Sequence, residues 1–287
     1  MTDHQPVSTN SPSGHEVLSN TKLSPDVNRL VVHAPRVAAV RRPGQFVIVR
    51  LGPGAERIPL TIADSDAAEG SIVLVIQAVG KSTGDLVTLA TGDRIHDIAG
   101  PLGRPSDLVA DGSAVCVAGG VGAAVVLPIA RGLAELGAAV TTVLGARTAE
   151  NVLFEDEFGS FGEVIVCTDD GSAGHHGLVT DALADLVAAH PVDVVYAAGP
   201  VPMMRAVVAV TRPLDVRTIV SLNPIMVDGT GMCGGCRVTV AGAMRFACVD
   251  GPEFDGFGVD FDELADRLGT YRQAEHEASG HVCRGTG

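Results

Sequence analysis

Residues 115–130 of the chain are VCVAGGVGAAVVLPIA: an apolar run, a glycine-rich turn and an alanine-rich helical pattern. The glycines are Gly119, Gly120 and Gly122. A strand that passes through such a turn into a helix is typical of a parallel α/β sheet, and the N–H groups at the helix start suit an anion such as pyrophosphate. Glycines there also serve tight packing alone, so the segment predicts the fold and leaves the ligand open.

The same alternation continues towards the C-terminus as far as about Val220. Helical patterns extend through Glu135, over Thr180 to Ala189 and onward from Val201. Between them lie apolar strand-like runs at residues 139–146, 163–170, 192–200 and 216–222. This alternation predicts a doubly wound parallel sheet, and we expect an α/β domain over residues 107–220.

Two further strands of this domain end in residues suited to a ligand. Asp170 follows one of them, and Gly199 with Met203 follows another. Because ligands bind outside the carboxyl ends of strands in open α/β sheets, three such ends on one edge favour a binding crevice. Asp170 or the nearby Ser172 could instead be a simple turn cap.

Short β-branched runs between turn residues occupy the N-terminal part of the chain, such as GQFVIVRL at 44–51 and GSIVLVIQAV at 70–79. They predict an antiparallel barrel over residues 16–106. The first twenty residues are rich in Ser, Thr and Pro and lack an apolar run, so they predict a flexible tail rather than a strand, with residues 1–15 outside the barrel. A second flexible tail is expected at 272–287.

Two barrel segments carry candidate binding residues. RIPLTI, residues 57–62, combines a guanidinium with a rigid proline and a hydroxyl, which suits a phosphate beside a flat ring. QAVGKST, residues 77–83, ends a strand at the start of a short helical pattern, where donors suit a diphosphate. An ordinary strand with a solvated Arg57 and a capped turn with a solvated Lys81 are the alternatives.

Three of the six cysteines lie close together near the C-terminus. MVDGTGMCGGCRVTV, residues 226–240, holds Cys233 and Cys236, and Cys248 follows. Without an export signal, such a group favours a metal site over disulfides. Plant-type [2Fe-2S] sites space their first three ligands as C-x4-C-x2-C, and Asp228 occupies the first of these positions. One alternative is a zinc site with three thiolate ligands and one oxygen or nitrogen ligand. The other is three free thiols that bind no metal.

The charge balance excludes one class of partner. The formal net charge is −14, from 34 acidic and 20 basic residues, which would repel a nucleic-acid backbone. The longest uncharged run, 112–130, contains several glycines and Pro128, so a strand, turn and helix explain it better than a membrane span. With no secretory h-region at the start, we expect a cytoplasmic protein.

Barrel, α/β domain and cysteine-bearing unit, in this order, resemble the electron-transfer subunit of dihydroorotate dehydrogenase and its relatives in the ferredoxin-NADP reductase superfamily. The resemblance extends from about Glu16 to Tyr271 and rests on GQFVIVR, ERIPLTI, QAVGKST, GPLGRP, AGGVGAA, TDDGS, AAGPVPMM and the cysteine segment. It implies a multi-domain fold, α/β plus all-β, with an FAD-binding barrel, an NAD(P)-binding domain and a [2Fe-2S] unit over residues 221–271 that ends in a helix.

The resemblance also implies a role for each matching residue. FAD would contact Arg57, Pro59, Leu60, Thr61, Gly80, Lys81, Ser82 and Thr83. The nicotinamide dinucleotide would contact Gly119, Gly120, Gly122, Asp170, Gly199 and Met203. The cluster ligands would be Asp228, Cys233, Cys236 and Cys248.

Asp228 stands where the orotate subunits have a cysteine. Residues 218–240 and 246–264 resemble instead the small, alpha subunit of NADH-dependent ferredoxin:NADP oxidoreductase, also known as sulfide dehydrogenase, in which this aspartate is characteristic. This implies an enzyme subunit in which NAD(P)H exchanges hydride with FAD, and single electrons leave through the cluster to a larger flavoprotein with [4Fe-4S] clusters, with ferredoxin a possible further partner.

Two other functions stay open. One is electron delivery to a dihydroorotate dehydrogenase catalytic subunit, and the other is a redox-sensing module that does not turn over pyridine nucleotide. Arg147, after the strand TTVLGA, could meet a 2′-phosphate or be solvated, and the resemblance favours NAD.

Overall fold

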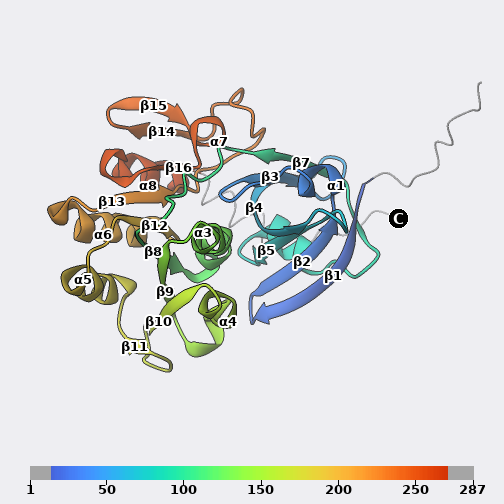
Figure 1. Cartoon of the computed structure of the whole chain (residues 1–287). Helices are drawn as coiled ribbons and strands as arrows, with labels where there is room; N and C mark the ends of the chain where they lie inside the picture. Colours follow the sequence, from blue (N-terminus) through green and yellow to red (C-terminus); the bar gives the residue numbers. More distant parts are fainter. Residues whose placement is uncertain (1–13, 271–287) are drawn as a thin grey trace, which may run out of the picture.

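The structure of the protein, a computed structural model, describes residues 14–270 of the 287-residue chain. Over these residues, two seven-stranded sheets lie side by side, and a two-stranded hairpin lies beyond one edge of the second sheet (Figure 1). Residues 1–13 of the tail predicted at 1–15, and the whole tail predicted at 272–287, lie outside the described residues.

The first sheet is antiparallel, in the order β6-β1-β2-β5-β4-β3-β7. Its two end strands are separated in sequence by His96 alone, so the sheet curls into a nearly closed barrel. Its core consists of alternate β-branched and leucine side chains, as the sequence pattern predicts. The elements are β1 (His15–Ser24), β2 (Val27–His33), α1 (Pro35–Ala38), β3 (Phe46–Arg50), β4 (Arg57–Asp66), β5 (Ser71–Gln77), α2 (Lys81–Val87), β6 (Arg94–Ile95) and β7 (Asp97–Leu102).

The prediction that the first twenty residues contain no strand is wrong. β1 begins at His15, which pairs with Ile95, and Val17 is completely buried. The polar residues around Val17 hide the strand in the sequence, because one face of β1 points to solvent. Pairing with β2 and β6 supplies the backbone hydrogen bonds that stabilise this polar segment.

The second sheet has the order β11-β10-β9-β8-β12-β13-β16, and all its paired strands are parallel except β16, which runs antiparallel beside β13. The prediction of a parallel α/β sheet is confirmed. Its strands are β8 (Ser113–Gly119), β9 (Ala139–Ala146), β10 (Gly162–Thr168), β11 (His175–His176), β12 (Val194–Ala198), β13 (Arg217–Ser221) and β16 (Glu253–Asp255).

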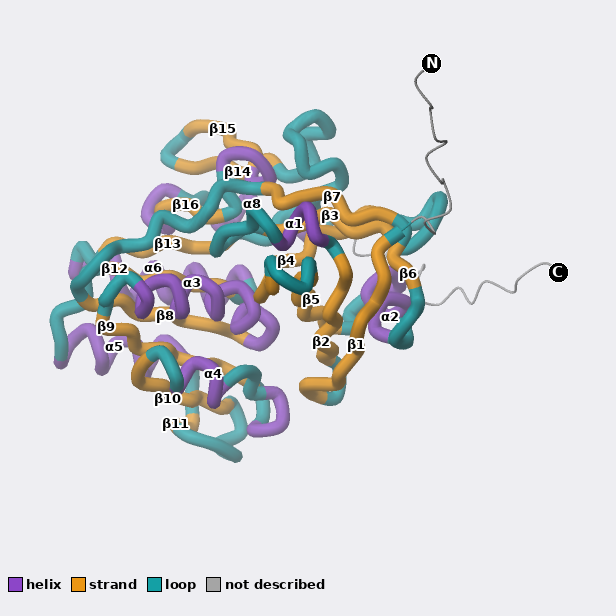
Figure 2. Tube along the Cα trace, turned by 45° about the vertical axis from the view of Figure 1, so that its right-hand side comes forward, coloured by secondary structure: helices purple, strands orange, loops and turns teal. Residues whose placement is uncertain are grey.

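Helices cover both faces of this sheet (Figure 2). Ala114, Cys116 and Ala118 of β8 belong to the core under α3, whereas Val115 and Val117 belong to the core under α5 and α6. This alternation follows from the two-residue period of a strand buried on both faces. The helices are α3 (Ala123–Glu135), α4 (Glu155–Gly159), α5 (Val179–Ala189) and α6 (Val201–Thr211).

The C-terminal unit is more regular than the sequence suggests. Its elements are β14 (Arg237–Val240), β15 (Ala243–Phe246), α7 (Ala247–Asp250), β16 and α8 (Phe261–Gly269). β14 and β15 form a hairpin that the sequence pattern does not predict, and β16 completes the neighbouring sheet. The glycines around the cysteines conceal the hairpin, because only its four-residue strands have β-type composition.

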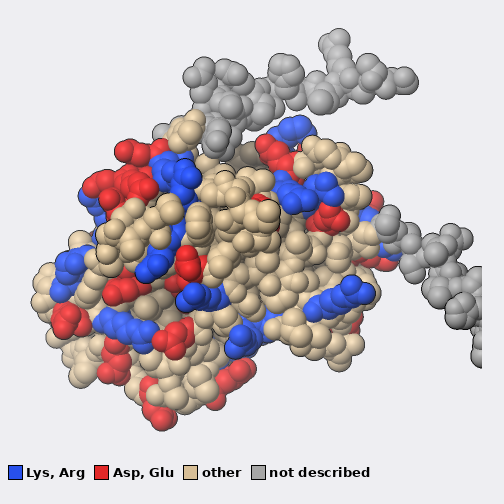
Figure 3. Space-filling view, turned by 90° about the horizontal axis from the view of Figure 1, so that it is seen from above, with Lys and Arg blue, Asp and Glu red and all other residues tan. Residues whose placement is uncertain are grey.

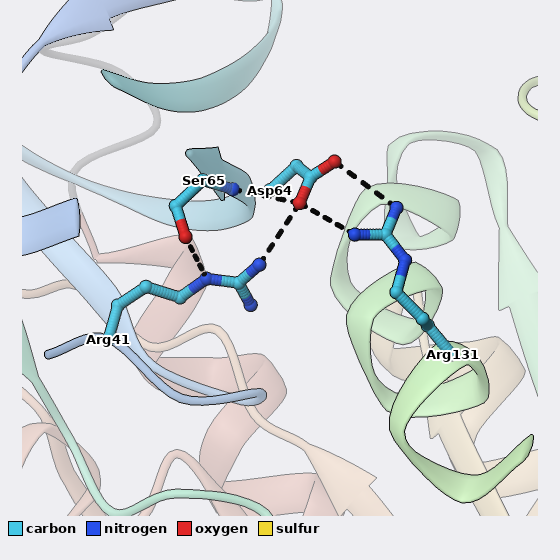
Figure 4. Close-up of polar contacts among 4 residues, drawn as sticks. All are labelled: Arg41, Asp64, Ser65 and Arg131. Carbon is cyan, nitrogen blue, oxygen red and sulfur yellow. Dashed lines mark hydrogen bonds and ion pairs between the residues drawn. The ribbon is translucent and has the colours of Figure 1, made fainter. Parts of the chain in front are cut away.

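A polar network joins the barrel to α3 (Figure 4). Asp64 of β4 binds the Arg131 guanidinium through both carboxylate oxygens, at 2.7 and 3.1 Å. Arg41, which follows α1, donates to Asp64 at 3.1 Å and to Ser65 at 2.7 Å. The two arginines thus share one carboxylate across the boundary between the two sheets.

Candidate functional site

The glycine turn after β8 faces the end of β12. A Cβ on Gly122 would lie 2.2 Å from the Ala198 carbonyl oxygen, so only glycine permits this approach. Gly119 and Gly199 both lie against the Met203 side chain, whose sulfur would be 2.5 Å from a Cβ on Gly119. The structure therefore brings four of the six predicted dinucleotide residues together at the carboxyl edge of the sheet, and Gly120 lies in the turn between them.

Asp170 lies on the same edge, two strands away, in the loop after β10. Hydrogen bonds from the Ser172 hydroxyl, at 2.6 Å, and from the Ser172 N–H, at 3.0 Å, lower the pKa of the Asp170 carboxyl. The Asp170 N–H donates to the carbonyl of Arg147, and Ser172 accepts the N–H of Ala149. Asp170 thus acts as a turn residue that ties the loops after β9 and β10 together, and its side chain is exposed beside the crevice.

The two predicted flavin segments are adjacent at one end of the barrel. The Ser82 hydroxyl of α2 donates to Glu56, immediately before β4, at 2.5 Å. The Thr83 hydroxyl accepts the backbone N–H groups of Val79 and Gly80, at 3.1 and 3.0 Å, which fixes the turn before α2. Lys81 forms an ion pair with Asp85 at 2.8 Å. The start of α2 therefore lies beside Glu56, the residue before β4, on an exposed surface.

The remaining flavin candidates lie along β4. Arg57 is exposed at its first residue, Leu60 is buried, and Pro59 and Thr61 are half-buried. Their alternation leaves the Arg57, Pro59 and Thr61 positions on one face of the strand. A guanidinium, a proline ring and a hydroxyl on one face suit a ring system with a phosphate at its end.

Cys236 and Cys248 form a close thiol pair. Their sulfurs are 3.2 Å apart, and both residues are almost completely buried. Burial, with the neighbouring Cys236 thiol, raises the pKa of Cys248 above its usual value. Metal binding at such a pair must release protons, because the thiolate is the ligand form.

Asp228 and Cys233 form the second pair of donors. The Asp228 carboxylate accepts the Thr230 N–H at 2.9 Å and the Cys233 N–H at 2.7 Å. These hydrogen bonds lower the pKa of Asp228, with the Thr230 N–H as the largest cause. Cys233 is exposed, and its sulfur accepts the Gly235 N–H at 3.4 Å. An ionised carboxylate therefore lies beside an accessible thiol.

This arrangement fits a two-iron cluster better than a single metal ion. Between residues 14 and 270, no three His, Cys, Asp or Glu side chains are grouped to hold one ion. The donors occur as two pairs, Asp228 with Cys233 and Cys236 with Cys248, and a [2Fe-2S] cluster takes two protein ligands on each iron.

The cluster loop packs directly on the barrel. A Cβ on Gly229 would lie 2.5 Å from Leu102 of β7 and 2.9 Å from Ile48 of β3. Ile48 also shares one core with Cys236 and Cys248, and it pairs with Pro59 of β4. One strand therefore separates the candidate flavin strand from the candidate cluster ligands.

Sequence reasoning missed two groups at the junctions between units. Ser106, in the segment between the sheets, donates to Glu253 of β16 at 2.6 Å. Burial raises the pKa of Glu253 to about 7. Arg267 of α8 donates to the Gly235 carbonyl, in the cluster loop, at 3.1 Å. Glu253 lies in the stretch 246–264 that carries the resemblance, but its burial and its contact with Ser106 follow only from the packing of the units, as does the contact of Arg267.

Comparison with known proteins identifies the family. The iron-sulfur cluster binding domain of dihydroorotate dehydrogenase B matches residues 223–260. A dihydroorotate dehydrogenase B electron-transfer subunit homologue of Thermotoga maritima is 49% identical and covers 91% of this chain and 93% of the relative. The electron-transfer subunit of Geobacillus thermodenitrificans is 36% identical over 83% of this chain and 94% of the relative. The chain belongs to this family.

Solved structures agree with this electron-transfer subunit family. A chain of the NADH-dependent reduced ferredoxin-NADP oxidoreductase has a TM-score of 0.89 and 46% identity, covering 94% of this chain and 98% of that chain. The ferredoxin reductase of carbazole 1,9a-dioxygenase has a TM-score of 0.60 at 22% identity, covers 70% of this chain and 65% of that chain, and shows the shared reductase fold alone. Within the described residues, no helix is long and apolar enough to cross a membrane.

Proposed function

We propose that the chain is the small subunit of an NADH-dependent ferredoxin-NADP oxidoreductase, which transfers electrons between NAD(H), FAD and a [2Fe-2S] cluster to a larger flavoprotein subunit. The observation that carries the proposal is the packing of the cluster loop on β3, one strand from the candidate flavin strand. It is supported by the similarity to that oxidoreductase over 94% of the chain.

Each of the three units of the chain has one proposed cofactor. We assign FAD to the barrel, residues 16–106, the dinucleotide to residues 107–220 and the cluster to residues 221–271. When bound, FAD accepts two electrons as hydride from a nicotinamide and releases them singly to the cluster. The barrel would hold the diphosphate with donors from Arg57 and the turn before α2. The crevice glycines would admit the dinucleotide close to the backbone.

The dinucleotide site lies against the barrel. The turn Gly120–Gly122 contacts β5, and α3 contacts β4. Because the turn Gly120–Gly122 belongs to the crevice and contacts β5, a nicotinamide bound at Gly119 and Gly199 would point towards the barrel. The role of the protein here is to orient the two rings and exclude water between them.

Preference for NAD over NADP is part of the proposal. This preference rests on the similarity to an NADH-dependent oxidoreductase. The cytoplasmic location expected from the sequence stays a prediction.

Anaerobic purification tests the function. We expect about one flavin and two irons per chain, with bleaching of the visible spectrum by NADH at much lower concentration than by NADPH. Retention of cofactors without bleaching by either nucleotide would contradict the proposal and favour a redox-sensing module. Absence of iron from anaerobically purified protein would also contradict the proposal, because there would be no cluster through which electrons could leave the flavin.

Dihydroorotate dehydrogenase is the second candidate partner, because the cluster-binding domain and relatives at 36–49% identity bear that enzyme's name. Asp228 distinguishes the two candidates, since the resemblance to the dihydroorotate dehydrogenase subunits implies a cysteine at this position. Co-purification from the native organism decides between them: a partner with [4Fe-4S] clusters supports the first, and an orotate-reducing partner supports the second.

A further inference from the structure

A cavity of about 440 Å³ lies behind the exposed cluster ligand. Cys233, Gly234 and Gly235 line it on the side of the cluster loop, and Arg237 and Arg267 line it from β14 and α8. The other lining residues are apolar apart from Thr270, and no carboxylate is among the described residues around it. Two positive charges therefore face a cysteine-bearing loop in a chain whose net charge is −14.

Both arginines touch the loop itself. Arg267 donates to the Gly235 carbonyl at 3.1 Å, and the Gly235 N–H donates to the Cys233 sulfur at 3.4 Å. The Arg237 guanidinium lies 3.2 Å from the position that a Cβ on Gly234 would take. Gly234 has φ +68°, so the loop turns towards the arginines through a conformation that glycine favours.

Arg267 has a buried polar atom without a partner. Its Nε is inaccessible and makes no hydrogen bond to any described residue. A charged group in such a place needs a counter-charge, because desolvation of an isolated guanidinium is costly. The Arg267 side chain reaches the loop because α8 packs against β14 and buries Phe261 and Leu264.

The surface around the hairpin does not suggest a polyanion as the counter-charge. In Figure 3, basic and acidic side chains are interspersed over the upper face, with uncharged surface between them. Among the residues that line the cavity, the candidate ligand Cys233 is the one that becomes anionic when it binds a metal. Four anionic ligands leave an oxidised [2Fe-2S] cluster negatively charged, and reduction adds one more negative charge.

We propose that Arg237 and Arg267 raise the reduction potential of the [2Fe-2S] cluster by placing two guanidinium charges behind Cys233. They are positioning and tuning residues, since neither is a ligand. A nearby positive charge stabilises the reduced state more than the oxidised state, because the reduced cluster carries the larger negative charge. The inference rests on the proposed function and deepens it by assigning the residues that set the cluster's potential.

Redox titration of the cluster by electron paramagnetic resonance tests the proposal on the full chain. Arg237→Gln and Arg267→Gln each remove one charge, and each is expected to lower the equilibrium constant for cluster reduction about tenfold, which is about 59 mV for one electron. Arg267→Lys keeps the charge and is expected to stay close to wild type. Arg245→Gln, an exposed change on the same hairpin outside the cavity, is the matched control.

The outcomes separate this inference from the proposed function. If the wild-type chain binds no [2Fe-2S] cluster, both fail. If the cluster is present and its potential is unchanged in Arg237→Gln and Arg267→Gln, the function stands and the tuning role is wrong. If Arg267→Gln does not retain iron, the cluster potentials of Arg237→Gln and Arg267→Lys still test the tuning role. Equal shifts in the Arg245→Gln control would show a general charge effect and also overturn the assignment.

Discussion

Replacing Asp64 by asparagine tests what holds the barrel to α3. The change keeps the shape and one acceptor but removes the charge that Arg41 and Arg131 share. The side chain of Arg41 is 10% exposed, and those of Asp64 and Arg131 are 29% and 31% exposed. Arg41 is therefore left nearly buried beside a second guanidinium, with Glu135 as the remaining acidic charge that acts on both arginines.

The expected loss in the free energy of unfolding lies between two limits. Exposed ion pairs contribute about 0–1 kcal/mol. Removing one partner of a fully buried pair costs about 3–5 kcal/mol. At intermediate exposure, and with bidentate geometry to Arg131, we expect Asp64→Asn to lose about 2 kcal/mol, or roughly 4–8 °C in Tm for a chain of this size.

A double-mutant cycle with Asp64→Asn and Arg131→Gln measures the coupling by chemical and thermal unfolding. We expect a coupling of at least about 1 kcal/mol. Asp262→Asn is the control, because its pair with Arg205 is 77% and 57% exposed and should change stability by less than about 0.5 kcal/mol. Equal losses in Asp64→Asn and the control, or no coupling, would refute the reasoning.

The same network has a pH signature. Burial alone would raise the pKa of Asp64, but hydrogen bonds from Arg131 and the Ser65 N–H, with the charges of both arginines, lower it overall. A carboxyl with a lowered pKa in the folded state stabilises the protein above its unfolded pKa, and the contribution is lost as the pH falls through the folded pKa. The gap between wild type and Asp64→Asn should therefore close in acid, below about pH 4.

Three further changes have defined outcomes. Burial raises the pKa of Glu253 from 4.5 to about 7, so the stability of the wild type should fall as the pH rises between these two values. Glu253→Gln should lack this fall. In urea unfolding at pH 8 the variant should be more stable than the wild type by about 1–3 kcal/mol. Gly122→Ala places a Cβ 2.2 Å from a backbone oxygen and should abolish bleaching by NADH while FAD stays bound. The control Gly159→Ala, whose Cβ lies in open space, should leave both FAD binding and bleaching by NADH unchanged. Cys248→Ser should reduce iron from about two per chain to near zero without loss of flavin, and retention of a normal cluster spectrum would contradict its place as a ligand.

Much of the fold follows from local pattern. β12 and most of β8 are continuous buried apolar runs, and the glycine turn before α3 marks the crevice edge, because burial on both faces and a tight turn each demand particular residue types. β1 escaped prediction because its ten residues are largely polar and half-exposed, and pairing with β2 and β6 stabilises them. The β14–β15 hairpin escaped prediction because its two four-residue strands lie in glycine-rich sequence and pair with each other.

The sequence by itself determined the donor types and their spacing: glycines at strand ends, RIPLTI and GKST in the barrel, and one aspartate with three cysteines. Only the tertiary structure decided which donors pair, how the cluster loop rests on β3, and which charges face it. Asp64, Glu253 and Arg267 act across distances of 67, 147 and 32 residues in sequence. Such contacts depend on how separate units pack, and no local preference of the chain encodes them.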